Sequence, residues 1–131
     1  MTNVSQHSEL IAAAARARER AHAPYSKFAV GAAVLTQRGN VFSGCNVENI
    51  SFGLTMCAER VCVGAAIASG DSGFREIAIV SDSGVPVAPC GACRQVLAEF
   101  APDLLIISAT VSGLIETNRL GILLPNPATE F

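Results

Sequence analysis

Charged residues are scarce in this sequence of 131 residues. Asp, Glu, Lys and Arg make up 15% of the chain, whereas hydrophobic residues make up 50%. An average globular protein contains about 25% charged residues. A small domain with so few charges must expose apolar surface or bury it against a partner, so the composition predicts a homo-oligomer.

The chain also lacks a basic block. Its nine Lys and Arg residues are scattered, and the formal net charge is −2. Binding a nucleic-acid polymer requires clustered positive charge, so we expect no such polymer as substrate. A small neutral substrate is compatible with this charge.

Long apolar runs are absent as well. The first eight residues are polar and lack the apolar core of a signal peptide, and no later run is long enough to span a membrane. The five cysteines are an odd number, which suits metal-bound thiolates in a reducing compartment better than a disulfide framework. We therefore expect a cytoplasmic protein that does not associate with membranes.

No repeat, low-complexity segment or linker interrupts the chain, so residues 1–131 are expected to form one domain. The residue patterns predict three helices and four strands. The helices are 8–22, 57–69 and 90–100, and the strands are 28–36, 41–47, 74–81 and 104–109. Residues 114–124 are compatible with a strand or a short helix, and residues 125–131 look irregular. This order predicts an α/β protein with one mixed sheet and helices on both faces.

Three cysteines have the spacing of metal ligands. Cys90 and Cys93 form a Cys-x-x-Cys pair, and Cys57 lies 33 positions before Cys90. Zinc is tetrahedral and binds thiolates, and three protein ligands leave a fourth position for water, as in catalytic sites. The alternatives are a redox pair or buried thiols, but the third cysteine favours one zinc per chain. Cys45 and Cys62 lie outside the spaced set and are expected to be small buried hydrophobic residues.

Glu59 lies two residues after Cys57. A carboxylate beside a metal site can take a proton from water and return it to a substrate, which makes Glu59 the candidate catalytic residue. The alternative is an acid at a helix N-terminus that is stabilised by the helix dipole. Both ligand groups stand at the starts of predicted helices, where free N–H groups and partial positive charge stabilise thiolates.

The wider sequence resembles the small zinc-dependent cytidine deaminases of nucleoside salvage. The resemblance extends from about residue 8 to about residue 110 and rests on four ordered segments. These are Ala-Pro-Tyr-Ser-Lys-Phe at 23–28, Gly-Cys-Asn-Val-Glu-Asn at 44–49, Cys-Ala-Glu-Arg at 57–60 and Pro-Cys-Gly-Ala-Cys-Arg-Gln-Val-Leu at 89–97. It implies a three-layer α/β/α fold with about five strands, assembled as a homotetramer whose sites are completed across interfaces. It also implies hydrolytic deamination of cytidine and deoxycytidine to the uridines, with release of ammonia.

The resemblance also implies residue roles. Asn46 and Glu48 alternate at the end of a strand, so they point the same way, and they are implied to bind the ribose hydroxyls. Phe28 is implied to pack on the pyrimidine ring, which suits an aromatic face, and the alternative is a core position. Arg60 is implied to compensate the thiolate charge.

Backbone groups are implied to hold the base. Those around Ala58 and around Pro89-Cys90 would contact the base edge and the amino group.

Two segments depart from the family pattern. The chain reads Ile50-Ser51-Phe52 where the family often has Ala-Tyr, and Leu123-Leu124-Pro125 is not followed closely by an aromatic residue, since Phe131 comes last. These departures favour, as an alternative, a zinc deaminase acting on another cytosine-containing compound such as a blasticidin-type nucleoside antibiotic. A second alternative is a zinc-stabilised binding protein without catalysis, against which Glu59 argues.

Overall fold

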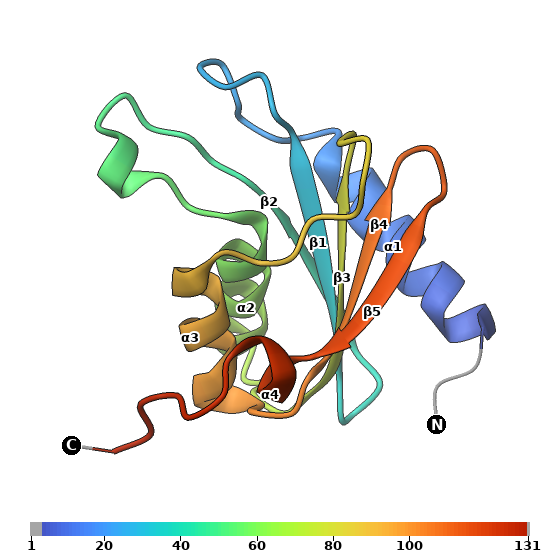
Figure 1. The fold of residues 1–131 in the computed structure, drawn as a ribbon, viewed down its shortest axis with the longest axis vertical. Coiled ribbons are helices and arrows are strands. Elements are labelled where there is room, and N and C mark those ends of the chain that lie inside the picture. Colours follow the sequence, from blue (N-terminus) through green and yellow to red (C-terminus); the bar gives the residue numbers. More distant parts are fainter. Residues whose placement is uncertain (1–3, 131) are drawn as a thin grey trace.

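A five-stranded sheet forms the centre of the computed structural model, which describes residues 4–130. The strands are β1 (Val30–Thr36), β2 (Val41–Cys45), β3 (Phe74–Ser81), β4 (Leu105–Thr110) and β5 (Ile115–Arg119). They lie in the order β2-β1-β3-β4-β5 (Figure 1). β3 and β4 are parallel, and the other neighbours are antiparallel. The prediction of one mixed sheet is confirmed.

Helices cover both faces of this sheet. Helix α1 (Val4–Arg18) packs on one face, and α2 (Ala58–Ala68) and α3 (Gly91–Phe100) lie side by side on the other (Figure 1). The short helices η1 (Phe52–Leu54) and α4 (Leu120–Leu123) complete the set. The predicted three-layer α/β/α arrangement is therefore confirmed. None of the helices formed by residues 4–130 has the length and apolar character that crossing a lipid bilayer requires.

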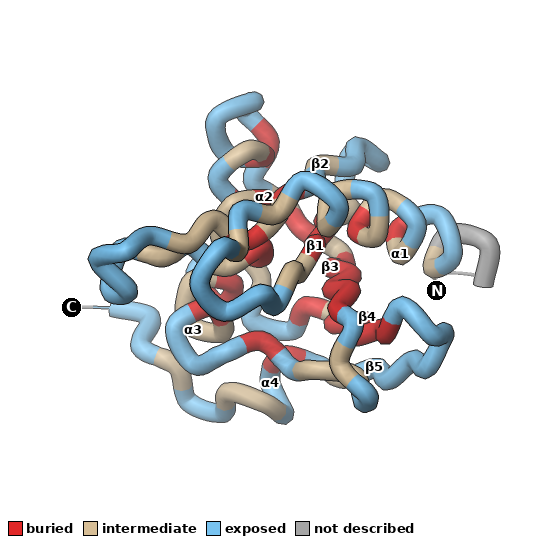
Figure 2. The backbone as a smooth tube through the Cα atoms, turned by 90° about the horizontal axis from the view of Figure 1, so that it is seen from above, coloured by how far each residue is buried: buried red, intermediate tan, exposed pale blue. Residues whose placement is uncertain are grey.

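The core has two parts, one on each face of the sheet, and Figure 2 shows the buried residues concentrated between the layers. Alternate residues of a strand point to opposite faces. Ile77 and Ile79 of β3 accordingly pack toward α2 and α3, whereas Ala78 and Val80 pack toward α1. Because both faces are buried, β3 reads in the sequence as a continuous apolar run.

The α1 face is packed unusually closely at Gly31 of β1. A β-carbon on Gly31 would lie 1.9 Å from the carbonyl oxygen of Ala14. Only glycine therefore fits there, and the small side chains Ala14 and Ala33 allow the helix to approach the sheet.

The predicted helix 8–22 is wrong at its C-terminal end, because α1 ends at Arg18. His22 donates its N–H to the Asn46 carbonyl oxygen at 3.0 Å and accepts from the N–H of Glu48 at 2.8 Å. These contacts with the chain after β2 replace helical hydrogen bonds. Val47 in turn pairs with Met56, so β2 ends at Cys45 and not at residue 47.

Helix α1 also begins earlier than predicted, at Val4 instead of residue 8. The remaining boundaries differ from the predicted ones by two residues or fewer. Residues 114–124, which were compatible with either a strand or a short helix, contain both, as β5 and α4.

Helix α2 is apolar almost all round, which is typical of a fully buried helix, but only one side of it is buried. Its Cys62, Val63 and Ala66 are buried against the sheet, but Gly64 and Ile67 are exposed. A single copy of the chain therefore leaves part of an apolar helix uncovered.

Candidate metal and substrate site

Cys57, Cys90 and Cys93 meet where α2 and α3 begin. Cys57 is the residue before α2, Cys90 is the residue before α3, and Cys93 lies in the first turn of α3. Their Sγ atoms all lie within 4.8 Å of one another. The Cys93 N–H also donates to Cys90 Sγ at 3.5 Å, so this sulfur caps the helix.

This cluster fits zinc. A tetrahedral zinc ion with Zn–S distances of about 2.3 Å places sulfurs roughly 3.8 Å apart, which the observed spacing reaches with small adjustments. A hydrogen bond from the Cys93 thiol, together with the Arg60 guanidinium, lowers the pKa of Cys57 to about 5. The same hydrogen bond, with burial, raises the pKa of Cys93. One thiolate is thus stabilised before any metal binds, and the chemistry of the donor set is that of a zinc site.

Arg60 lies beside the cluster. Its Nη2 donates to Cys57 Sγ at 3.6 Å and to the carbonyl oxygen of Thr55 at 3.2 Å. The positive charge therefore faces a thiolate. By contrast, Cys62 is buried elsewhere in α2, where its Sγ donates to the Glu59 carbonyl oxygen, and Cys45 is half-buried in β2.

A cavity of about 240 Å³ opens beside the cysteines. It brings together six residues that the sequence singled out, namely Phe28, Asn46, Cys57, Ala58, Glu59 and Cys90. Glu48, Arg60 and Cys93 are not part of its lining. Its lining also includes residues that sequence reasoning missed: Val30, Thr55, Ile79, Val87 and Ala88.

The missed lining residues carried only weak signals. Val30 and Ile79 have the pattern of core strands and gave no sign of facing a cavity. Val87 and Ala88 directly precede Pro89, and their position beside the cysteine motif was the one available signal.

Glu59 is the second residue of α2 and lines this cavity next to Cys57. Its side chain is buried, and only 5% of the residue is exposed. Burial, and then the nearby Cys57 thiolate, raise the pKa of Glu59 above its ordinary value. The site thus places a carboxyl group with increased proton affinity against a metal-binding cluster.

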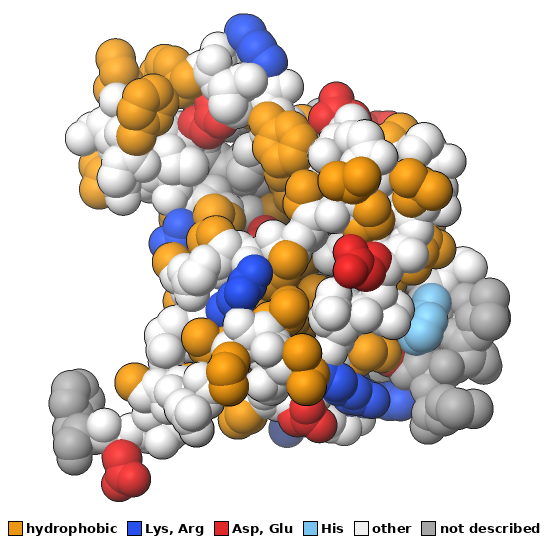
Figure 3. All heavy atoms as spheres, viewed as in Figure 1, with side chains coloured by type: hydrophobic (Ala, Val, Ile, Leu, Met, Phe, Trp, Pro, Cys, Tyr) orange, Lys and Arg blue, Asp and Glu red, His pale blue; other side chains and the backbone are white. Residues whose placement is uncertain are grey.

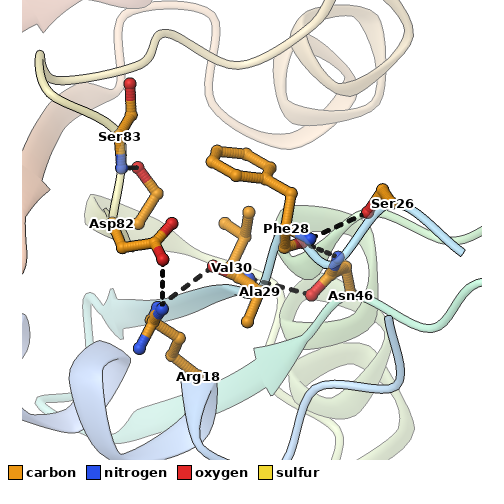
Figure 4. A network of polar contacts seen from close by, with 9 residues as sticks. Arg18, Ser26, Phe28, Ala29, Val30, Asn46, Asp82 and Ser83 are labelled. Atoms are coloured by element: carbon orange, nitrogen blue, oxygen red, sulfur yellow. Dashed lines mark hydrogen bonds and ion pairs between the residues drawn. The ribbon is translucent and has the colours of Figure 1, made fainter. Parts of the chain in front are cut away.

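The segment that carries Phe28 is held by side chains from other parts of the chain (Figure 4). Asn46 Nδ2 donates to the Phe28 carbonyl oxygen at 2.8 Å, and Asn46 Oδ1 accepts from the Val30 N–H at 2.9 Å. Arg18 Nε donates to the Ala29 carbonyl oxygen at 3.1 Å, and Arg18 forms an ion pair with Asp82 at 3.2 Å. These contacts fix the backbone from which the Phe28 ring reaches the cavity.

Glu48 contacts the preceding part of the same segment. Its Oε1 accepts from the N–H groups of Tyr25 and Ser26 at 3.0 and 3.2 Å, and its Oε2 accepts from Ser26 Oγ. Ser26 Oγ also accepts from the Phe28 N–H at 3.0 Å. Hydrogen bonding, first from the Ser26 hydroxyl, lowers the pKa of Glu48. Asn46 and Glu48 thus both face residues 25–30, as their alternation suggested.

Lys27 lies between Ser26 and Phe28 and has a left-handed backbone with φ 61°. This conformation is uncommon for a residue other than glycine. The anchors on both sides, at Ser26 and Phe28, stabilise it.

The loop 48–56 projects from the body of the protein, and Figure 3 shows hydrophobic side chains gathered on it at the upper left. Phe52 is 73% exposed and makes an edge-to-face contact with Tyr25, with ring centroids 6.0 Å apart. Ile50 and Leu54 are exposed as well.

The C-terminal tail contacts α3 through one hydrogen bond. Gln95 Nε2 of this helix donates to the Ala128 carbonyl oxygen at 3.0 Å. The other aromatic residue that the sequence singled out, Phe131, lies outside the described residues.

Comparison with known proteins agrees with this geometry. A family model described as "Cytidine and deoxycytidylate deaminase zinc-binding region" matches residues 4–109. A curated cytidine deaminase from Sporosarcina psychrophila is 46% identical over 118 residues, which cover 89% of this chain and 87% of the relative. A blasticidin-S deaminase from Bacillus cereus is 31% identical over 100 residues, covering 70% of this chain and 71% of the relative.

A solved structure is similar over almost the whole chain. The crystal structure of a cytidine deaminase from Burkholderia pseudomallei superposes with a TM-score of 0.90 at 47% identity, covering 98% of this chain and 100% of the other. The resemblance found in the sequence is therefore confirmed, and Cys57, Cys90 and Cys93 are the zinc ligands. The chain belongs to the cytidine and deoxycytidylate deaminase zinc-binding family.

Proposed function

We propose that this protein catalyses the hydrolytic deamination of cytidine and deoxycytidine to uridine and deoxyuridine, with release of ammonia. The observation that carries the proposal is the position of Glu59, which is buried and faces the same cavity as Cys57, Cys90 and Phe28. A binding protein has no need for a buried carboxyl group beside a zinc cluster, whereas a deaminase needs a group that moves protons.

Glu59 is the proton carrier of this reaction. Zinc held by Cys57, Cys90 and Cys93 supplies Lewis-acid activation of a water molecule. Glu59 takes a proton from the water oxygen and delivers it to N3 of the cytosine ring. After the oxygen has bonded to C4, Glu59 takes the remaining proton from this oxygen, which becomes the C4 carbonyl, and transfers it to the amino nitrogen, which leaves as ammonia. Water and cytidine are thereby converted to uridine and ammonia.

The remaining residues bind and orient the nucleoside. The Phe28 ring packs on the pyrimidine, and backbone groups at Ala58 and at Pro89-Cys90 hold the base edge and the amino group. Asn46 binds the ribose with the hydrogen-bonding capacity left over from its contacts with residues 28 and 30, because a carboxamide has two N–H groups and two acceptor lone pairs. Glu48 accepts from the ribose hydroxyls.

The substrate is a free nucleoside, and neither a nucleotide nor a polynucleotide. Because Glu48 accepts from the ribose hydroxyls in this proposal, its negative charge repels a phosphate group attached to the ribose. Within residues 46–60 the one Lys or Arg is Arg60, which already contacts the cysteine cluster.

The test is the loss of the cytosine ultraviolet absorbance in a panel of compounds. The panel contains cytidine, deoxycytidine, deoxycytidine 5′-monophosphate, a short cytosine oligonucleotide and blasticidin S. We expect turnover of the two nucleosides and at most weak turnover of the others. Turnover of blasticidin S alone would support the alternative deaminase, to which the similarity to the Bacillus cereus relative points. No turnover by the zinc-loaded protein would favour a binding protein.

We infer in addition that the chain forms a single cytoplasmic domain that assembles as a homotetramer. A single domain is supported by the sheet, because both parts of the core pack against it. A cytoplasmic location is supported by the zinc-binding cysteines, because free thiols persist in a reducing compartment. The exposed apolar residues of loop 48–56 and the uncovered side of α2 support assembly, since surfaces of this kind mark interaction sites. Light scattering tests it: we expect a tetramer, and a stable, active monomer would contradict the inference. A Phe52→Ser variant is expected to weaken the assembly, whereas Ile122→Ser, an equally exposed residue in α4, serves as control.

A further inference from the structure

Arg94 of α3 bridges two backbone carbonyl groups from distant parts of the chain. Its Nε donates to the Pro89 oxygen at 2.7 Å, and its Nη1 donates to the Leu123 oxygen at 3.0 Å. Pro89 directly precedes the zinc ligand Cys90, and Leu123 ends α4. The side chain is half-buried, so both contacts are partly shielded from water.

The first contact holds one wall of the substrate cavity. Residues 82–90 form neither helix nor strand, so their conformation depends on contacts with other parts of the fold. Ala88 and Cys90 line the cavity, and the buried Pro89 lies between them. Proline has no N–H, so its carbonyl oxygen is the one backbone group through which it can be held.

That carbonyl also determines the direction of the next N–H group. The described chain has no cis peptide bonds. In a trans peptide the C=O and the N–H point in opposite directions within one plane. The hydrogen bond to Pro89 therefore fixes the plane of the Pro89–Cys90 peptide and the orientation of the Cys90 N–H.

Arginine suits this task better than lysine. A guanidinium group presents several N–H donors in a rigid planar fork, whereas an ammonium group is a single point at the end of a flexible chain. Two carbonyl oxygens in different directions can thus be held at once. The contact with Leu123 also connects the wall to the segment that follows β5.

We propose that Arg94 is a positioning residue for the deamination. It orients the Ala88–Cys90 wall of the cavity through the Pro89 carbonyl and braces that wall against Leu123. The proposal rests on the proposed function, because it concerns the binding of the same nucleoside.

The test compares Arg94→Ala, Arg94→Lys and a matched control, Gln95→Ala. Gln95 is the next residue of α3 and contacts the C-terminal tail at Ala128, but it does not contact Pro89. Zinc content, Tm, kcat and KM for cytidine are measured for each variant.

Misplacement of binding groups by about 1 Å can cost roughly 10²-fold in rate. For Arg94→Ala we expect KM to rise about tenfold, and kcat/KM to fall by roughly 10- to 100-fold, with one zinc per chain retained. Arg94→Lys should show an intermediate KM, and Gln95→Ala should match the wild type.

The KM distinguishes positioning from a purely structural role. A variant that only loses stability contains fewer active molecules, which lowers the apparent kcat and leaves KM unchanged. Millimolar guanidinium added to Arg94→Ala should lower its KM, because the free cation can occupy the space left by the side chain. A normal KM in both Arg94 variants would overturn the proposal, as would loss of zinc accompanied by a normal KM. If Arg94→Ala does not fold, the KM of Arg94→Lys decides. An inactive wild-type protein would instead refute the proposed function.

Discussion

Asn46 and Phe28 are joined through a hydrogen bond of 2.8 Å from the Asn46 carboxamide to the Phe28 backbone carbonyl. A residue expected to bind ribose thus also fixes the residue expected to bind the base. Because the same carboxamide accepts from Val30, its orientation is determined by the protein before a substrate arrives.

This relationship predicts the effect of Asn46→Asp. The carboxylate still accepts from the Val30 N–H, but it cannot donate to the Phe28 carbonyl. Loss of this partly buried hydrogen bond costs about 0.5–1.5 kcal/mol. We expect a loss of that size in the free energy of unfolding, measured by urea titration, and a higher KM for cytidine. Asn49→Asp is the control, because the Asn49 carboxamide oxygen accepts from the Ser51 N–H, as an aspartate also can. Equal behaviour of the two variants would contradict the role of Asn46.

The zinc assignment predicts a distinct pattern among the five cysteines. Cys57→Ala, Cys90→Ala and Cys93→Ala should each lose the metal, because each removes one of three ligands. Cys45→Ala and Cys62→Ala should keep one zinc per chain, since neither residue belongs to the cluster. Metal analysis of the purified variants checks this. Loss of zinc from Cys45→Ala, with retention in Cys57→Ala, would show that the ligands are assigned incorrectly.

Glu59→Gln should keep zinc and lose nearly all turnover. The amide preserves the shape of the side chain but cannot carry a proton. General acid–base groups contribute about 10²–10⁴ in rate, so kcat should fall by about 10²-fold or more. The measurement is kcat for cytidine at equal zinc content. A near-normal kcat would remove Glu59 from the proton transfers.

Gly44 determines how closely α2 approaches β2. A β-carbon at Gly44 would lie 2.6 Å from the backbone nitrogen of Cys62. We expect Gly44→Ala to destabilise the protein by about 1–3 kcal/mol, as overpacked cores do. Activity should fall as well, because α2 carries Glu59. The control is Gly84→Ala in the exposed loop after β3, where a β-carbon has no neighbour within 4 Å. That change should stabilise the protein by roughly 0.4–1 kcal/mol, so similar effects of both substitutions on unfolding would contradict the packing argument.

We predict that the Asp71 carboxylate makes part of the free energy of unfolding depend on pH. Its Oδ2 accepts from Asn40 Nδ2 at 3.1 Å, and this hydrogen bond is the main reason that the pKa of Asp71 is lowered. The stabilisation is present above the ordinary carboxyl pKa of about 3.9 and is lost as the pH falls through the lower native pKa. Asp71→Asn should therefore have a lower Tm than the wild type at neutral pH. The difference should shrink at strongly acidic pH, and a constant difference would argue against the assignment.

The metal site and the central strands could be predicted because their signals are local. Thiol ligands need short fixed spacings, and β3 must be apolar on both faces. The end of α1 was not predictable, because it depends on His22 pairing with residues that follow β2. For the same reason, Arg94 looked like an ordinary helical arginine until the fold placed it near the Pro89 carbonyl. The end of α1 and the role of Arg94 both depend on contacts between segments that are distant in the sequence, and local sequence patterns do not predict such contacts.

The position of the cysteine cluster at the starts of two helices also has a thermodynamic consequence. The unfolded chain holds no such cluster, since Cys57 and Cys90 are 33 positions apart. A metal that binds only the native state adds its binding free energy to folding, by about 2.7 kcal/mol when free zinc is 100 times its Kd. Joining the beginning of α2 to the beginning of α3 therefore makes the Tm of the protein depend on the free zinc concentration around it.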